Sequence, residues 1–254
     1  MDTSASESIE KSIGYTRARV GLIIPSGNRM TEAHFRHFAP PDLGFHPARL
    51  RVTRGYKLTL PDLLDAVART AEILSDVGAD LIGFHCNATS MEHGTDGDAK
   101  ILEAITKATG IAAISTAQAT VDALRAVNIR RLVLLTPYDQ DTNDEERHHL
   151  EQLGFDVLHD VFIGRQPGVR HYEHPPERWL ELTRANLRSD ADGYLMSCTN
   201  TTQIDVIEPL ERELGKPVIN SNQAMIWACL NRLTAKLGPV KPIAAFGRLM
   251  GKRQ

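Results

Sequence analysis

Short apolar runs rich in Val, Ile and Leu alternate along this chain with longer segments in which apolar residues recur every three or four positions. The runs are typical of buried parallel strands and the segments of amphipathic helices, so the pattern predicts an α/β protein built of βαβ units. The predicted strands are Val20–Pro25, Leu50–Thr53, Leu81–Cys86, Ile111–Ser115, Leu132–Pro137, Val157–Ile163, Tyr194–Cys198 and Pro217–Asn220. The predicted helices are Pro61–Val77, Ala99–Ala108, Ala117–Val127, Asp141–Leu153, Pro176–Leu187, Gln203–Leu214 and Asn222–Leu237.

The second half of the chain repeats the first. Pro25 and Pro137 close similar apolar runs 112 residues apart, and Cys86 and Cys198 follow similar runs that are also 112 residues apart. A third match relates residues 113–119 to residues 218–224, at an offset of 105. A repeat of this length predicts a tandem duplication of a domain-sized unit, with about four parallel strands in each half.

Two thiols occupy equivalent positions in the repeat. Because ligands bind beyond the carboxyl ends of parallel strands, Cys86 and Cys198 are expected to face each other across a cleft between the halves. Backbone N–H groups at such strand ends are expected to lower the pKa of both thiols. A cysteine placed there serves as a nucleophile or as an acid and base. Cys229 lies within an apolar helical pattern and is expected to be a buried packing residue.

Other polar residues give weaker signals. The segment Pro25-Ser-Gly-Asn28 suits an anion-binding turn, but its residue types are also those of an ordinary turn. Tyr138 follows the equivalent strand and either donates its phenol to the same anion or is buried with a satisfied hydroxyl. The histidines, His85 and His149 among them, form no ligand spacing and are expected at the surface or in turns. The sequence has no GxGxxG, P-loop or HExxH motif, so nucleotide and metal chemistry lack support.

Composition narrows the function classes. The 254 residues carry 29 basic and 32 acidic side chains, a net charge of −3, which predicts no nucleic-acid or anionic-membrane partner. Met1–Ser12 has no apolar core, and no later run approaches bilayer length, so we expect a cytoplasmic protein without a secretory signal or a membrane segment. Three cysteines without a CxxC pair predict free thiols rather than a disulfide framework.

Several of these segments together resemble the aspartate/glutamate racemase superfamily, and within it the branch of maleate cis-trans isomerases and arylmalonate decarboxylases. The resemblance spans nearly the whole chain after Gly14. The segments that carry it are Gly21–Asn28, Cys86–Ser90, Thr136–Tyr138 with Asn143, Ser197–Asn200, Pro217–Ser221 and Phe246–Leu249.

The resemblance implies two pseudo-symmetric Rossmann-like lobes, each with a four-stranded parallel sheet, and no metal or organic cofactor. Residues 1–115 with 222–254 would form the first lobe, and residues 116–221 the second. Homo-oligomers, dimers or tetramers, are common in the family.

The resemblance also assigns expected roles to residues. Cys86 would attack the double bond of a small carboxylate substrate and Cys198 would handle the proton. Asn28 and Tyr138 match the family's carboxylate-binding residues, and the backbone at Asn87, Thr199 and Asn200 would complete the anion pockets.

These roles favour a cis-trans isomerase acting on a small unsaturated dicarboxylate such as maleate. An amino-acid or hydantoin racemase would use the same two thiols, and an arylmalonate-type decarboxylase needs only the second, so the presence of Cys86 favours isomerase or racemase. A non-catalytic binding protein on the same scaffold is a further alternative. One departure concerns specificity: maleate isomerases carry a substrate-binding asparagine shortly after the sixth strand, where this chain has Gly164-Arg-Gln-Pro-Gly168. Arg165 or Gln166 would have to replace it.

Overall fold

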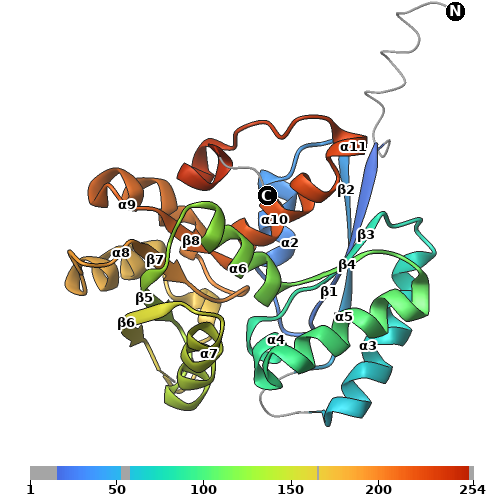
Figure 1. Cartoon of the computed structure of the whole chain (residues 1–254), viewed down its shortest axis with the longest axis horizontal. Helices are drawn as coiled ribbons and strands as arrows, with labels where there is room; N and C mark the ends of the chain where they lie inside the picture. Colours follow the sequence, from blue (N-terminus) through green and yellow to red (C-terminus); the bar gives the residue numbers. More distant parts are fainter. Residues whose placement is uncertain (1–15, 53–57, 165, 252–254) are drawn as a thin grey trace, which may run out of the picture.

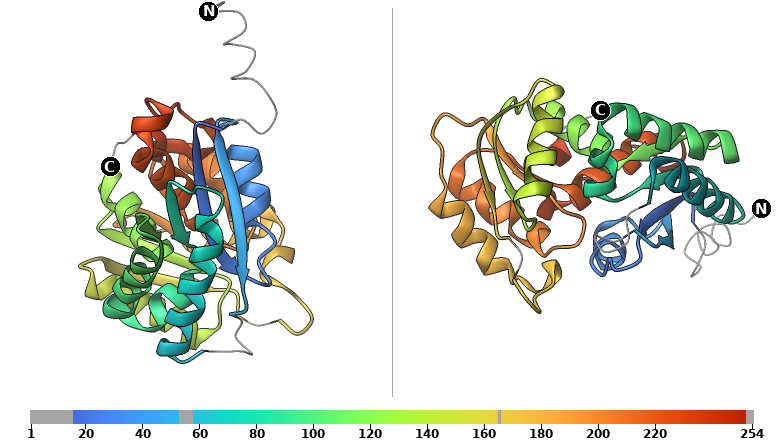
Figure 2. Two further views of the ribbon diagram at one scale, coloured as in Figure 1. Left: turned by 90° about the vertical axis from the view of Figure 1, so that its right-hand side faces the viewer. Right: turned by 90° about the horizontal axis from the view of Figure 1, so that it is seen from below.

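Two four-stranded parallel sheets lie side by side in the computed structural model, which describes residues 16–52, 58–164 and 166–251 (Figures 1 and 2). The first sheet has the order β2-β1-β3-β4 and the second the order β6-β5-β7-β8. The predicted α/β class with two four-stranded parallel sheets is confirmed. The strands are β1 Ala18–Pro25, β2 Leu43–Leu50, β3 Leu81–Phe84, β4 Ala113–Ser115, β5 Arg131–Thr136, β6 Asp156–Phe162, β7 Gly193–Met196 and β8 Val218–Asn220.

Helices connect the strands and flank both sheets. Local signals set several boundaries: the side chains of Thr59, Ser115 and Asp139 cap the helices that follow them, and Gly110 ends one with a φ of 70°. The α-helices are α2 Thr31–Phe38, α3 Leu60–Ser75, α4 Asn87–Glu92, α5 Gly94–Thr109, α6 Thr116–Ala126, α7 Gln140–Gln152, α8 Pro176–Ala185, α9 Ile207–Leu214, α10 Ser221–Arg232 and α11 Thr234–Leu237. The 3₁₀ segments are η1 His171–Glu173, η2 Gln203–Val206 and η3 Ala244–Gly251.

The helices α6 and α10 join the two halves. Each follows the last strand of its sheet, and the two pack against each other near the centre of the molecule (Figure 1). Helix α10 also contacts α2, which follows the first strand of the first sheet. One continuous hydrophobic core includes buried residues of both sheets, such as Leu22 and Leu134, with Trp227 of α10. A smaller core, around Val67 and Ile101, lies between the first sheet and helices α3 and α5.

The predicted elements differ from the structure in several places. The second strand is β2, which ends at Leu50 where the predicted strand begins; Pro47 within it masks the strand pattern, and its missing N–H is tolerated because β2 is an edge strand. Helix α2 was absent from the list because its sequence is mostly polar and aromatic. The helix predicted over Asn222–Leu237 is interrupted at Leu233 and forms α10 and α11.

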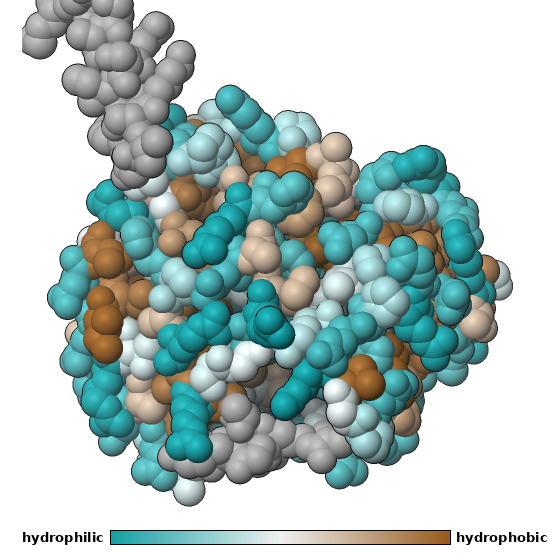
Figure 3. Space-filling view, turned by 180° about the vertical axis from the view of Figure 1, so that it is seen from behind, coloured by the Kyte–Doolittle hydropathy of each residue, from teal (hydrophilic) through white to brown (hydrophobic). Residues whose placement is uncertain are grey.

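Some sequence-based expectations fall outside the described residues: the leader Met1–Ser12, the end of the strand predicted over Leu50–Thr53, and Arg165. Among the residues described, no helix is both long and apolar enough to cross a membrane. The face shown in Figure 3 is largely polar, with apolar atoms in small separate groups.

Candidate active site

The cysteines predicted to be functional follow equivalent strands. Strand β3 ends two residues before Cys86, and β7 ends two residues before Cys198. Cys86 is partly buried and Cys198 is 4% exposed. The Tyr138 hydroxyl lies within hydrogen-bonding reach of the Cys198 thiol, and the charge of a Cys86 thiolate would act on both groups. The two thiols and this phenol therefore lie close enough to affect each other's ionisation.

Burial controls the ionisation of these groups. It raises the pKa of the Cys198 thiol to about 12, although the Asn200 N–H donates to Cys198 Sγ at 3.3 Å and acts in the opposite direction. Burial also raises the pKa of the Cys86 thiol, against the effect of the hydroxyl and N–H of Thr89. The expectation that strand-end N–H groups lower both thiol pKa values was wrong, because desolvation outweighs these hydrogen bonds. Burial likewise raises the pKa of Tyr138.

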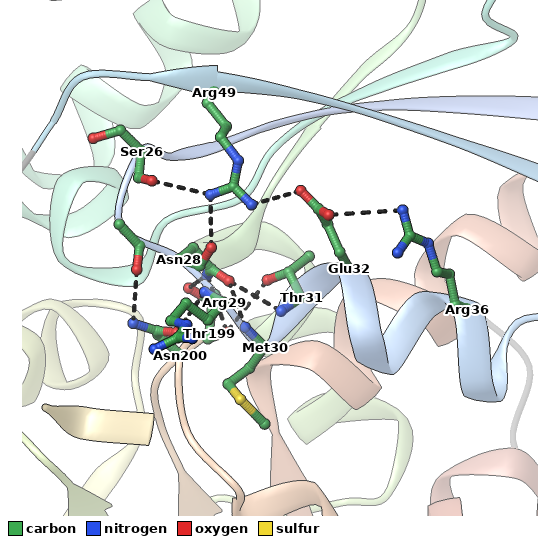
Figure 4. A network of polar contacts seen from close by, with 11 residues as sticks. Ser26, Asn28, Arg29, Met30, Thr31, Glu32, Arg36, Arg49, Thr199 and Asn200 are labelled. Atoms are coloured by element: carbon green, nitrogen blue, oxygen red, sulfur yellow. Dashed lines mark hydrogen bonds and ion pairs between the residues drawn. The ribbon is translucent and has the colours of Figure 1, made fainter. Parts of the chain in front are cut away.

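Asn28 connects the first half to the loop after Cys198 (Figure 4). Its Nδ2 donates to the carbonyl oxygen and to Oγ1 of Thr199, both at 3.1 Å. Its Oδ1 accepts from the backbone N–H groups of Met30 and Thr31, at 3.1 and 3.0 Å. A second hydrogen bond joins the same two segments: Asn200 Oδ1 accepts from the Arg29 N–H at 2.9 Å. The predicted anion-binding residues Asn28, Thr199 and Asn200 therefore meet in one hydrogen-bonded junction.

The turn that carries Asn28 is held from behind by Arg49. Its guanidinium donates to the carbonyl oxygens of Ser26 and Asn28, at 3.0 and 2.7 Å, and pairs with Glu32 at 2.6 Å (Figure 4). Arg49 lies near the end of β2, which pairs with β1 throughout its length. The edge strand therefore fixes the conformation of the turn after the first strand.

The loop between β6 and α8 reaches the same region. The Arg29 guanidinium donates to the hydroxyl of Tyr172 at 3.1 Å and lies 4.7 Å from the centre of its ring. The ring of the adjacent His171 packs edge-on against Tyr138, with 5.7 Å between the ring centres. The segment in which the chain departs from the maleate isomerase pattern belongs to this loop.

A third contact between the halves joins the neighbours of the two cysteines. Asn87 follows Cys86, Ser197 precedes Cys198, and Asn87 Nδ2 donates to Ser197 Oγ at 2.5 Å. The carboxyl of Glu146, on α7, lies beside both and is 2% exposed. Burial raises the pKa of Glu146 to about 7; Ser197 and Asn87 lower it, but neither makes a hydrogen bond of ordinary geometry with the carboxyl.

A buried histidine, His85, is connected to the junction through hydrogen bonds. His85 is fully buried, with its ring nitrogens 3.0 Å from Thr116 Oγ1 and 2.7 Å from Asn222 Oδ1. Asn222 also donates to the carbonyl oxygen of Thr199 at 3.1 Å. Burial lowers the pKa of His85 to about 4, so the ring is neutral. Its expected surface or turn position was wrong, and so was that of His149, which is 3% exposed.

Sequence reasoning overlooked Glu146 and the histidine network. Glu146 lies three positions after Asn143 on α7, so both side chains share a helix face, and that spacing was the available signal. Cys229 is fully buried within α10, as its apolar surroundings predicted. Within the described part of the chain, no group of three or more His, Cys, Asp and Glu side chains is arranged to hold a metal ion.

Proteins of known function are similar to this chain over nearly its whole length. A maleate isomerase of Geobacillus stearothermophilus is 24% identical over 232 residues, which cover 86% of this chain and 92% of that protein. An arylmalonate decarboxylase of Bordetella bronchiseptica is 27% identical over 236 residues, 91% of this chain and 95% of that protein.

Solved structures agree in fold. A Nocardia farcinica maleate cis-trans isomerase variant with a covalently bound succinylcysteine intermediate matches with a TM-score of 0.81 and 23% identity, over 92% of this chain and 98% of that chain. A crystal structure of arylmalonate decarboxylase matches with a TM-score of 0.77 and 26% identity, over 92% of this chain and 99% of that chain. The family model described as arylmalonate decarboxylase matches residues 20–249, and the chain therefore belongs to the arylmalonate decarboxylase family.

Proposed function

We propose that this protein is a cofactor-independent isomerase that converts a small cis-unsaturated dicarboxylate, such as maleate, to its trans isomer. The observation that carries the proposal is the pair of thiols, Cys86 and Cys198, at equivalent strand ends and close enough that charge on Cys86 raises the pKa of Cys198. Decarboxylation of a malonate requires one proton donor, whereas rotation about a double bond is explained by a nucleophile and a proton donor together.

The reaction follows from the positions of the two thiols. The Cys86 thiol first passes its proton to solvent water. The thiolate then adds to one alkene carbon, a carbon–sulfur bond forms and the electron pair of the double bond moves toward the adjacent carboxylate. The Cys198 thiol then protonates the second carbon, which leaves a saturated thioether and a Cys198 thiolate. Rotation about the new single bond is free. The Cys198 thiolate removes a proton from the same carbon, the double bond re-forms, and the Cys86 thiolate leaves.

The succinylcysteine intermediate described for the Nocardia farcinica enzyme has the composition expected of such a thioether. In this chain the high pKa of the Cys198 thiol suits the proton donor, because the thiol is protonated in the resting enzyme. We infer that Asn28, Tyr138 and the N–H groups of Asn87, Thr199 and Asn200 bind the carboxylates of the substrate. Preorganised donors of this kind stabilise the negative charge that develops during addition.

The test is to incubate the purified protein with maleate and to follow fumarate formation by proton NMR. The variants are Cys86→Ala and Cys198→Ala, with Cys229→Ala as a control, because Cys229 is also a free thiol but is buried within α10. We expect conversion by the wild type and by Cys229→Ala and loss of conversion in both other variants. Conversion that survives in Cys86→Ala would contradict the proposal.

Decarboxylation of a substituted malonate is the second candidate, and the family membership favours it. The same variants separate the two functions. A decarboxylase would release carbon dioxide from a disubstituted malonate and would retain this activity in Cys86→Ala but not in Cys198→Ala. A racemase would instead exchange the α-proton of a saturated amino acid or hydantoin in heavy water and would require both thiols.

A further inference from the structure

Glu146 is a buried acid for which the reaction above has no role. It lies on α7, which packs against α4 of the other half and against β6. Among the described residues, neither carboxyl oxygen of Glu146 has a hydrogen-bond partner, and the same holds for Oδ1 of the neighbouring Asn87. A buried polar group without a partner costs about 1–3 kcal/mol, and more if charged, so three such atoms on two neighbouring residues require an explanation.

Protonation of the Glu146 carboxyl would give these buried atoms hydrogen-bond partners. A carboxylate and an amide oxygen are both acceptors and repel each other, but a protonated carboxyl is a donor on one oxygen. The O–H of Glu146 can then donate to Asn87 Oδ1, while Ser197 Oγ, which already accepts from Asn87 Nδ2, donates to the other carboxyl oxygen. The result is a closed ring of three hydrogen bonds in which every one of these buried atoms has a partner.

We propose that protonated Glu146 is a positioning residue that closes this ring with Asn87 and Ser197 and thereby holds the two cysteine-bearing loops in register. Asn87 adjoins Cys86 and Ser197 adjoins Cys198, so the ring acts on both thiols at once. This positioning role rests on the proposed two-thiol reaction, whereas the proton on Glu146 does not.

The surroundings favour the neutral acid. Burial is the largest influence on Glu146, and Ser197 and Asn87 offset part of it. On the elements packed against α7, α4 carries Glu92, and β6 carries His159 and Asp160, the latter bound by Arg147 and Asn143. On α7 itself, burial lowers the pKa of His149, so this ring is neutral. Ionised Glu146 would also raise the pKa of Cys198 and Tyr138, so loss of its proton both opens the ring and disfavours thiolate formation.

The first measurement needs no substrate. Infrared spectroscopy detects the C=O stretch of a protonated carboxyl, which a carboxylate lacks. We compare the wild type with Glu146→Gln, whose amide donates and accepts in the same places without ionising, and with Glu145→Gln, which removes the exposed carboxyl next to it. We expect a band that titrates near pH 7, that Glu145→Gln retains and that Glu146→Gln lacks. If the wild type has no such band, or if Glu146→Gln retains it, the proposal is overturned.

The second measurement concerns the role in turnover. A group that titrates near 7 is about one-tenth protonated at pH 8, so the ratio of the Glu146→Gln rate to the wild-type rate should rise about tenfold between pH 6 and pH 8. For Glu145→Gln the ratio to the wild type should not change with pH. Glu146→Ala, which cannot close the ring, should turn over slowly at every pH.

The outcomes separate the two proposals. A constant ratio for Glu146→Gln would overturn the positioning role even if maleate is isomerised. If the wild type leaves maleate unchanged but the infrared band is present and depends on Glu146, the protonated ring stands and the proposed substrate is wrong.

Discussion

Replacement of Asn28 by alanine tests how the two halves are held together. Alanine removes both ends of the Asn28 bridge: the acceptor of the Met30 and Thr31 N–H groups and the donor to Thr199. The Thr199 carbonyl keeps its bonds from Asn222 and from the Thr31 hydroxyl, so it stays satisfied. The loss therefore falls on the two N–H groups that open α2, of which that of Thr31 is in a fully buried residue.

One buried unsatisfied N–H costs about 1–3 kcal/mol, so Asn28→Ala should lower the free energy of unfolding by about 1–3 kcal/mol. Urea denaturation measures this as a lower midpoint with an unchanged m-value. Ser26→Ala, in the exposed part of the same turn, is the matched control and should lose less than about 0.5 kcal/mol. A loss below about 1 kcal/mol in Asn28→Ala would refute the view that this side chain stabilises the junction.

Three further predictions follow from burial and packing. With its pKa raised to about 12, Cys198 should react with iodoacetamide at pH 8 about a thousandfold more slowly than an ordinary thiol; peptide mapping by mass spectrometry that finds rates within tenfold would contradict this. Gly193→Ala should lower stability by about 1–3 kcal/mol, because the new Cβ would lie 2.6 Å from the carbonyl oxygen of Pro217; an unchanged melting temperature would count against it. Burial raises the pKa of Asp98 to about 6, so its contribution to stability is lost as the pH rises through that value. Asp98→Asn should accordingly gain up to about 3 kcal/mol relative to the wild type between pH 4 and pH 8, and parallel denaturation curves at the two pH values would disprove this.

The internal repeat made the fold and the central thiols predictable. Equivalent apolar runs occupy equivalent strands, so Cys86 and Cys198 were expected to follow the carboxyl ends of corresponding strands. The structure places them there, after β3 and β7. Strand β2 escaped prediction because Pro47 and Gly44 break its pattern, and only the sheet order shows that it is an edge. Residue spacing does not show how completely a fold excludes water from a side chain. The predicted direction of the thiol pKa shifts was therefore wrong.

The sequence also did not predict which hydrogen-bond partners the buried polar side chains have. Asn28 was expected to bind a substrate carboxylate, and that role stays a prediction; the structure adds that its amide already bonds to Thr199. Glu146 looked like one of several charged residues on a polar helix, since α7 is mostly hydrophilic. Its isolation becomes visible only when residues 110 positions apart, Asn87 and Ser197, are placed beside it.

The duplicated halves, which pack together through α6 and α10, belong to a single polypeptide, and this has a consequence for handedness. In a symmetric dimer of half-length chains, any substitution would appear in both halves. In one polypeptide each side can diverge alone: the position 112 residues before Tyr138 is Ser26, so the phenol near Cys198 has no counterpart near Cys86. A flat, symmetric alkene bound between the two thiols would thus meet chemically different groups on its two faces, and the direction of attack would be fixed before the reaction begins.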